Sequence, residues 1–207
     1  MTDIPSSGAA PDVQRAIAAF HRHAFTALLA GETPRVADIE EAASRDALGV
    51  AGAVTWLEDH GELERDGELL VGAHGLTRRI TSHTLTIGEH TLHTWCAYDA
   101  IAIPVALGAA ARVTTSCPAC QRSLTIDVDA GHLPETDTPV LWMPIGPCER
   151  VIDDFCPHAN LFCTGEHVEG LRRGAGDPDG QILTLAQVPA TALAAWADIA
   201  KLGDPGE

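Results

Sequence analysis

The sequence predicts an α+β fold, in which a winged-helix-like unit of three helices precedes a mixed or antiparallel β-sheet core with flanking helices. Up to His60, apolar residues recur at steps of three and four, which is typical of amphipathic helices. After Gly75, short apolar runs alternate with turn residues, which is typical of strands. All six cysteines lie beyond residue 95. We therefore expect two domains, a helical domain over residues 1–80 and a cysteine-bearing α+β domain over residues 81–207.

The first domain is expected to contain three helices and a hairpin. The predicted helices cover residues 12–30, 35–44 and 46–60. Asp46 is a candidate N-cap of the third helix, and Gly61 follows that helix as a stop. A hairpin over residues 62–70 turns at Asp66-Gly67. This order of elements is the layout of a winged helix.

The second domain is expected to alternate short strands with two helices. The predicted strands cover residues 85–87, 90–94, 112–115, 123–128, 140–143 and 180–187. A mostly buried helix over 95–107 contains Pro104, which should kink the helix or restart its turn. A last helix over 188–202 should place Leu193, Trp196, Ala197 and Ile199 in the core.

The chain is strongly acidic, with 13 Lys+Arg against 29 Asp+Glu and a formal net charge of −16. Binding to nucleic acid depends on neutralising phosphates with basic side chains, and a polybasic membrane anchor needs the same residues. The third predicted helix, which would have to enter a DNA groove, contains no Lys or Arg. We therefore expect no nucleic-acid partner and no membrane partner, and a structural or substrate-covering role for the helical unit.

The N-terminus and the longest apolar run of the sequence indicate the cellular compartment in which we expect the protein. The N-terminus lacks the apolar stretch of a signal peptide. The longest uncharged apolar run, residues 100–111, is shorter than the roughly 20 residues that span a bilayer. These features predict a cytoplasmic protein with reduced thiols, in which clustered cysteines more often bind metal or act in catalysis than form disulfides.

Cys96 and Asp99 are three residues apart at the start of the predicted buried helix, so their side chains share one face. The unpaired N–H groups of a first helical turn favour a thiolate, which would lower the pKa of Cys96. Burial in the apolar run would raise the pKa of Asp99 and let it exchange protons near neutrality. The alternative is that Cys96 is a small core residue and Asp99 an exposed charge.

Cys117-x-x-Cys120 lies between two predicted strands, as in a zinc knuckle. The chain has no second Cys-x-x-Cys pair to complete such a site. Two readings stay open: a reduced pair of thiols in a tight turn, or a structural zinc site. The candidates for the remaining zinc ligands are Cys148, Cys156, His158 and Cys163.

A third cluster occupies residues 155–163, where Cys156 and His158 follow a pair of acidic residues. This segment could be a metal-ligand loop, a nucleophile loop or part of the core. The residues alone do not distinguish these roles.

Three segments together resemble the organomercurial (alkylmercury) lyase family. The helical N-terminal unit and the C-terminal strand and helix are also similar to that family. The most specific segments are Trp95-Cys96-Ala97-Tyr98-Asp99 with its apolar run to Pro104, and Phe155-Cys156-Pro157-His158; a third is the strand that leads from Arg112 to Cys117.

The resemblance implies cleavage of the carbon–mercury bond of alkyl or aryl mercury compounds by protonolysis, which gives a hydrocarbon and Hg(II). It implies catalytic roles for Cys96, Asp99 and Cys156, which would also form the mercury site. Soft thiolates are the preferred ligands of a soft cation. Mercury is here the substrate, so no cofactor is required. Low-molecular-weight thiols, or a mercuric reductase as partner, would remove the Hg(II).

The chain also departs from the family pattern. Pro157 stands where many members have a second cysteine, and Cys120, Cys148 and Cys163 are additional to the usual set. Cys117 is implied to be structural, and with Cys120 it supplies further candidate thiols for metal. The alternative function is a non-catalytic mercury- or zinc-binding winged-helix regulator or sensor.

Overall fold

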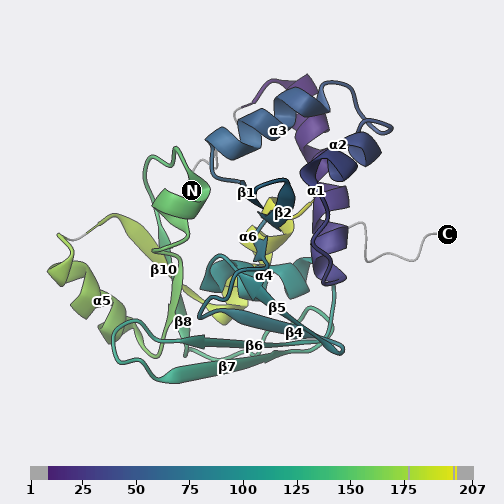
Figure 1. Cartoon of the computed structure of the whole chain (residues 1–207). Coiled ribbons are helices and arrows are strands. Elements are labelled where there is room, and N and C mark those ends of the chain that lie inside the picture. Colours follow the sequence, from purple (N-terminus) through teal and green to yellow (C-terminus); the bar gives the residue numbers. More distant parts are fainter. Residues whose placement is uncertain (1–8, 177, 198, 200–207) are drawn as a thin grey trace.

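The computed structural model describes residues 9–176, 178–197 and 199 (Figure 1). Its helices are α1 (Pro11–Leu29), α2 (Val36–Ala43), α3 (Val50–Asp59), α4 (Ala97–Ala106), α5 (Gly165–Gly174) and α6 (Val188–Ala195). Its strands are β1 (Leu63–Asp66), β2 (Leu69–Ala73), β3 (Leu76–Thr77), β4 (Thr84–Ile87), β5 (His90–Thr94), β6 (Ala111–Ser116), β7 (Ser123–Val128), β8 (Val140–Pro144), β9 (Asn160–Phe162) and β10 (Gly180–Thr184). A π-helical turn (Val151–Phe155) precedes Cys156, and a 3-10 turn (Leu185–Gln187) precedes α6.

The strands form two antiparallel sheets. The larger sheet has the order β1-β2-β3-β5-β4-β6-β7, and the smaller has the order β10-β8-β9. The pairings that define them are all antiparallel. Together with the helices, they confirm the predicted α+β class. The larger sheet continues from β3 to β5 across residue 80, and the division into two domains there stays a prediction.

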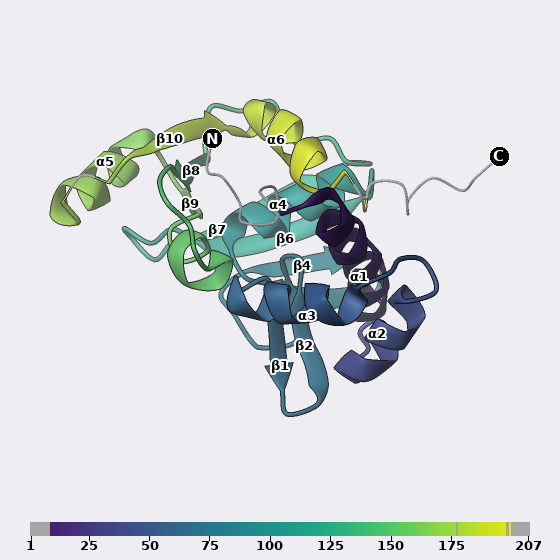
Figure 2. The ribbon, with the colours of Figure 1, turned by 90° about the horizontal axis from the view of Figure 1, so that it is seen from above.

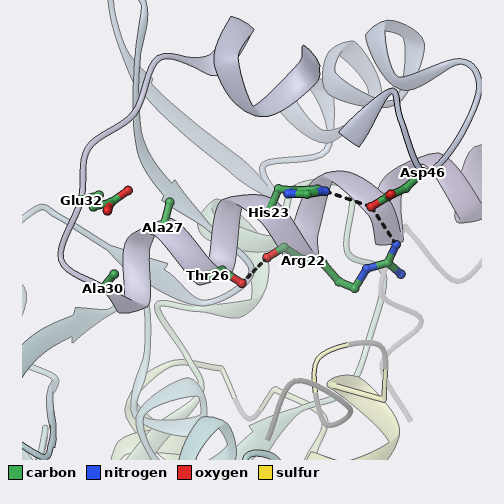
Figure 3. Close-up of a pocket in the computed structure, with 7 residues that line it drawn as sticks. All are labelled: Arg22, His23, Thr26, Ala27, Ala30, Glu32 and Asp46. Carbon is green, nitrogen blue, oxygen red and sulfur yellow. Dashed lines mark hydrogen bonds and ion pairs between the residues drawn. The ribbon is translucent and has the colours of Figure 1, made fainter. Parts of the chain in front are cut away.

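The third helix begins at Val50, four residues later than the sequence indicates. Gly49 adopts φ 78°, a left-handed conformation that turns the chain immediately before the helix. Asp46 is therefore not its N-cap. Its carboxylate lies 2.9 Å from His23 Nε2 and 3.5 Å from Arg22 Nη2, at a surface hollow on α1 (Figure 3). Asp46 thus fastens the loop before α3 to α1.

Helix α4 lies at the centre of the molecule, between the larger sheet and α6 (Figures 1 and 2). All ten of its residues are buried. The sequence from Ala100 to Ala106 carries no polar side chain, so the helix can be covered on every side. Pro104 is accommodated inside it. The N-terminal residue of this helix is therefore held in a fully packed environment.

The C-terminal helix is shorter than expected. α6 ends at Ala195, and the predicted extension to 202 lies mostly outside the described residues. Trp196 and Ile199 are buried as expected, but Leu193 is 51% exposed and Ala197 is also exposed. At about 100° per residue, Leu193 lies about 100° from buried Ala192 and about 140° from buried Val188, which turns it away from the core. No helix among the described residues is long and apolar enough to cross a membrane.

Candidate active site

The first turn of α4 brings Cys96 and Asp99 into direct contact. Cys96 is the N-cap, and Asp99 is the third residue of the helix. The Cys96 backbone N–H donates to Asp99 Oδ2 at 3.2 Å, and the Asp99 N–H donates to Cys96 Sγ at 3.4 Å. This is a capping box in which a cysteine replaces the usual hydroxyl residue. The Cys96 thiol also donates to Asp99 Oδ2, at 3.1 Å.

Cys156 reaches the same place from a segment sixty residues away. It follows the π-helical turn, whose start is bound to the end of α3 by hydrogen bonds from Val151 N to His60 O at 2.9 Å and from Ile152 N to Gly61 O at 3.3 Å. Beyond Cys156, Ala159 O accepts a hydrogen bond from Ala97 N at 3.2 Å. The ligand atoms of Cys96, Asp99 and Cys156 all lie within 4.8 Å of one another. The structure thus brings the three predicted catalytic residues together.

All three side chains are at most 5% exposed, and burial dominates their protonation. Burial raises the pKa of the Cys96 thiol well above its ordinary value, and Cys156 and Asp99 add to that shift. The pKa of Cys156 is lowered by the hydrogen bond with Cys96, but burial and nearby carboxylates raise it more. The expected lowering at the helix start is therefore wrong for Cys96, because desolvation outweighs the helix N–H groups.

Burial also raises the pKa of Asp99, to about 7, although its hydrogen bonds from Cys96 act in the opposite direction. The sequence predicted this shift from the apolar surroundings. Near neutral pH the two thiols therefore hold their protons, while the carboxyl group is close to half ionised. Such a trio contains a base and two proton donors close together in a largely buried site.

A small cavity opens beside Asp99. Its volume is about 70 Å³. Trp95, Tyr98, Phe155 and Trp196 contribute aromatic rings to its lining, with Tyr98 5.5 Å from the Trp196 ring and 6.2 Å from that of Phe155. The cavity suits a small apolar group placed next to a carboxyl group.

The backbone at Gly75 closes tightly on Asp99. Gly75 has φ +90°, and a Cβ built there would lie 3.0 Å from Asp99 Cγ. Its carbonyl oxygen accepts a hydrogen bond from Trp95 N at 3.0 Å. Gly75 therefore fixes the position of the carboxyl group, a role that its place between β2 and β3 does not reveal in the sequence.

The remaining candidate residues lie elsewhere. Cys117, Cys120 and Cys163 form a separate group with His167, within 4.8 Å of one another. Cys148 is half-buried in a different hollow, and His158 is exposed. Neither of these two joins the trio or the four-residue group among the described residues. His167 has a signal in its spacing, because it stands four residues after Cys163.

A family model described as alkylmercury lyase matches residues 76–197, more than half of the chain. The chain belongs to the alkylmercury lyase family. The matched range contains Cys96, Asp99 and Cys156, and the family assignment agrees with the resemblance carried by the sequence motifs.

Two curated relatives of the alkylmercury lyase family support the assignment. An alkylmercury lyase of Pseudomonas putida is 32% identical over 135 residues, which cover 60% of this chain and 59% of the relative. An alkylmercury lyase of Streptomyces lividans is 27% identical over 113 residues, which cover 53% of this chain and 52% of the relative. The matches thus span only a little over half the length of these relatives.

The fold of this alkylmercury lyase family member is shared with a solved structure. The crystal structure of the mercury-bound form of MerB2 matches with a TM-score of 0.78 at 21% sequence identity, over 96% of this chain and 94% of that chain. At that identity the match establishes the common fold. It covers the helical N-terminal part as well as the range of the family model.

Proposed function

We propose that this protein cleaves the carbon–mercury bond of small organomercurials by protonolysis, releasing a hydrocarbon and Hg(II). The observation that carries the proposal is the buried contact of Cys96, Asp99 and Cys156, with Asp99 facing a small cavity lined largely by aromatic rings. Two sulfur atoms can hold a soft cation, and a carboxyl group with a pKa of about 7 can both accept and return a proton.

The first step is capture of mercury by Cys96. Its thiol proton passes to Asp99 Oδ2, 3.1 Å away, as the sulfur displaces the ligand that the organomercurial carries. The raised pKa of Cys96 does not prevent this step, because a coordinating metal ion drives the loss of the thiol proton. The ionised fraction of Asp99 near pH 7 supplies the base.

The second step joins Cys156 to the mercury, its thiol proton passing to the displaced ligand, and breaks the carbon–mercury bond. The electron pair of that bond takes the proton from Asp99 and forms a C–H bond. For a substrate carried as a thiolate complex, R–Hg–SR′, two thiol protons leave the enzyme. One ends on the hydrocarbon R–H and the other on the free thiol R′SH, while Hg(II) stays on the two sulfur atoms.

Removal of Hg(II) requires competing soft ligands. We propose that low-molecular-weight thiols of the cytoplasm exchange with Cys96 and Cys156, and that a mercuric reductase then accepts the ion. Two buried sulfur atoms held by separate segments can be displaced one after the other, which suits stepwise thiol exchange.

The cavity size bears on substrate choice. A volume of about 70 Å³ is well below the roughly 150 Å³ of an apolar cavity that accepts benzene. We therefore propose that short alkyl groups enter without rearrangement, whereas an aryl group requires Trp196 or its aromatic neighbours to move.

The test is release of methane from methylmercury in the presence of excess thiol, measured by gas chromatography. The wild type should release methane, and Cys96→Ser and Cys156→Ser should lose nearly all activity. Cys148→Ser is the matched control, because it removes a thiol outside the trio and should retain activity. The proposal fails if the wild type performs no better than Cys96→Ser.

The alternative, a metal-responsive winged-helix regulator, has one favourable observation: α1, α2, α3 and the β1–β2 hairpin follow in winged-helix order. Helix α3 nevertheless contains no Lys or Arg. Mercury-dependent binding to duplex DNA without methane release would favour this alternative over the lyase.

A further inference from the structure

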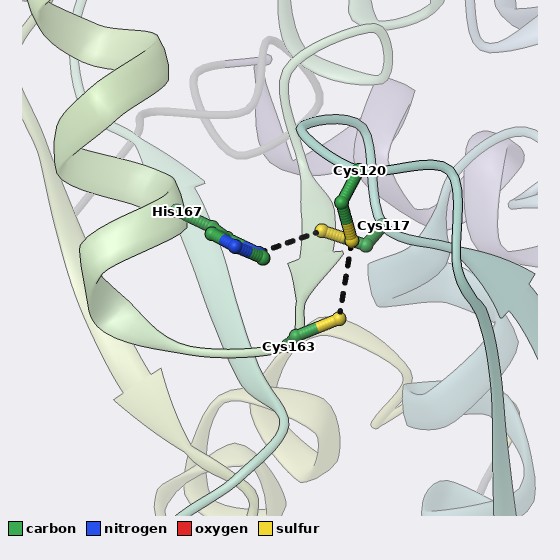
Figure 4. A group of neighbouring side chains, drawn as sticks. All are labelled: Cys117, Cys120, Cys163 and His167. Atoms are coloured by element: carbon green, nitrogen blue, oxygen red, sulfur yellow. Dashed lines mark hydrogen bonds between the residues drawn. The ribbon is translucent and has the colours of Figure 1, made fainter.

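Outside the trio, four metal-ligating side chains converge from two separate segments (Figure 4). Cys117 follows β6, Cys120 lies in the turn to β7, Cys163 follows β9, and His167 belongs to the first turn of α5. From this geometry we infer that Cys117, Cys120, Cys163 and His167 bind one zinc ion. The inference concerns a different site from the proposed lyase reaction and does not depend on it.

The distances between these atoms match the edges of a tetrahedron around zinc. Zn–S bonds of about 2.3 Å and Zn–N bonds of about 2.0–2.1 Å give edges of roughly 3.8 Å between sulfurs and 3.6 Å between sulfur and nitrogen. Cys120 Sγ and Cys163 Sγ are 3.6 Å apart, and Cys117 Sγ and His167 Nδ1 are 3.4 Å apart. The sulfurs are too far apart for a disulfide, which needs about 2.05 Å, and all three cysteines are free.

The turn that carries the first two ligands is shaped for the site. Cys117 N donates to Arg122 O at 2.9 Å, and Gln121 N donates to Cys117 O at 2.8 Å. Gln121 adopts φ 60°, an uncommon conformation for a residue with a side chain. This tight closure points both cysteine side chains to the same side, as a chelating Cys-x-x-Cys pair requires.

The four-residue group is reachable from solvent at one of its ligands. Cys117 and Cys163 are buried, whereas Cys120 is exposed. This exposure leaves a route for the ion from solvent.

A bound zinc ion would stabilise the position of helix α5. Of its ten residues only Val168 is buried, so apolar packing holds it weakly. Arg172 of α5 also lies over the Trp142 ring of β8, 4.9 Å from its centroid. A zinc ion on His167 would bind α5 to the β6–β7 turn of the larger sheet and to the end of β9. It would thereby also fix the segment between Cys156 and Cys163.

The zinc content of the full-length protein, measured by mass spectrometry after purification and after reloading with Zn²⁺, tests the inference. We expect one zinc ion per chain in the wild type, and a loss of at least about tenfold in affinity in Cys120→Ser and His167→Ala. Cys148→Ser is the matched control and should keep its zinc. Co²⁺ in place of Zn²⁺ should give the ligand-field spectrum of a tetrahedral thiolate site in the wild type and not in Cys120→Ser.

Two outcomes would overturn the inference. One is a wild type that takes up no zinc even after reloading. The other is zinc that persists in Cys120→Ser and His167→Ala but disappears in Cys96→Ser, which would place the ion at the trio. The failure of the lyase proposal is separate, because methane release is measured independently of zinc content.

Discussion

At the scale of single residues, Asp99 has two functions that conflict energetically. It completes the capping box of α4, and its burial makes the charged form costly. The same burial gives it a pKa of about 7, which suits a group that accepts and returns a proton. Replacing the carboxyl group should therefore show how much its burial lowers the free energy of unfolding.

We predict that Asp99→Asn stabilises the protein increasingly as the pH rises. The pKa of Asp99 in the folded chain, about 7, exceeds its ordinary value of 3.8. The unfolded chain therefore loses this proton first, and the wild type loses stability from about pH 4 until pH 7. At ~1.4 kcal/mol per pH unit, the advantage of the variant should grow by roughly 2 kcal/mol between pH 5.5 and 8.

Urea unfolding at the two pH values, under reducing conditions, measures this advantage. The exposed Asp66→Asn in the β1–β2 turn is the control for loss of one surface charge. Equal differences from wild type at both pH values would contradict the prediction. Asp99→Asn should also lose protonolysis while still binding mercury, since both thiols remain.

Gly75→Ala should reduce methane release by about a hundredfold while the chain still folds. The new Cβ would meet Asp99 atoms at 3.0–3.1 Å and push the carboxyl group from its place. A displacement of about 1 Å at a reacting group can cost this much. Gly88→Ala is the matched control, since Gly88 also has positive φ but nothing within 4 Å of the added carbon. A similar loss in both variants would assign the effect to backbone strain alone.

At the scale of elements, the end of α3 supports the segment that carries Cys156. Arg150 Nη1 donates to the carbonyl oxygens of Glu58 and Asp59 at 2.9 and 2.7 Å. Its Nε also pairs with Asp153, at 2.6 Å. A cation at a helix C-terminus is favourable because the last carbonyl groups lack partners within the helix. The end of the helical unit thus holds the segment that leads to Cys156, and the structural or substrate-covering role of this unit stays a prediction.

We predict that Arg150→Gln lowers stability by about 1 kcal/mol, because charge-assisted hydrogen bonds to the end of α3 are lost at a partly exposed position. Methane release should fall several-fold, since Cys156 is held less firmly. Thermal unfolding and the methane assay measure the two effects. Arg112→Gln, which removes an exposed ion pair with Asp127 on the sheet, is the control and should leave activity unchanged. Unchanged activity in Arg150→Gln would show that this contact does not position Cys156.

The elements that the sequence predicts well are those whose pattern is complete within one segment. The range of β7 is as predicted, and α1 and β6 differ by a residue at each end. By contrast, α5 and β9 were not expected. Helix α5 carries only two large apolar residues, Val168 and Leu171, too few to show a repeated apolar pattern, and β9 is three residues long and exists through its pairing with β8.

The candidate site likewise has contacts that the sequence predicts and contacts that it does not. The contact of Cys96 with Asp99 follows from helical spacing alone. The convergence of Cys156 depends on how distant segments pack, and only the family resemblance indicated it. The predicted lowering of the Cys96 pKa was wrong, because local spacing places the thiol near the helix N–H groups but does not reveal how deeply it is buried. The approach of His167 to Cys163 was not predicted either, because it depends on a helix that the sequence pattern does not reveal.

At the scale of the whole molecule, the N-terminal unit and the cysteine-bearing part contribute strands to the same sheet. The larger sheet runs through β1, β2 and β3 before continuing into β5. The cavity beside Asp99 takes part of its wall from Glu62, His74 and Gly75, all before residue 80. Loss of the first eighty residues would therefore remove three strands and part of the wall of the candidate active site.

We predict that a fragment of residues 81–207 does not fold on its own. Without β3, the β5 edge of the sheet has no partner, and buried α4 residues lose their cover. Circular dichroism and urea unfolding of the fragment should show no cooperative transition, in contrast to the full chain. A cooperative transition in the fragment would support two independent domains divided at residue 80.

The capping box of α4 consists of the atoms that react in the proposed chemistry. When mercury replaces the thiol proton of Cys96, the sulfur keeps a lone pair for the Asp99 N–H, but it can no longer donate to Asp99 Oδ2. The Hg(II)-bound product, in which Asp99 is ionised again, therefore lacks a hydrogen bond that the free protein has, a difference of about 1 kcal/mol. Departure of Hg(II) with reprotonation of Cys96 restores this bond, so the capping pair at the start of the central helix acts against product inhibition.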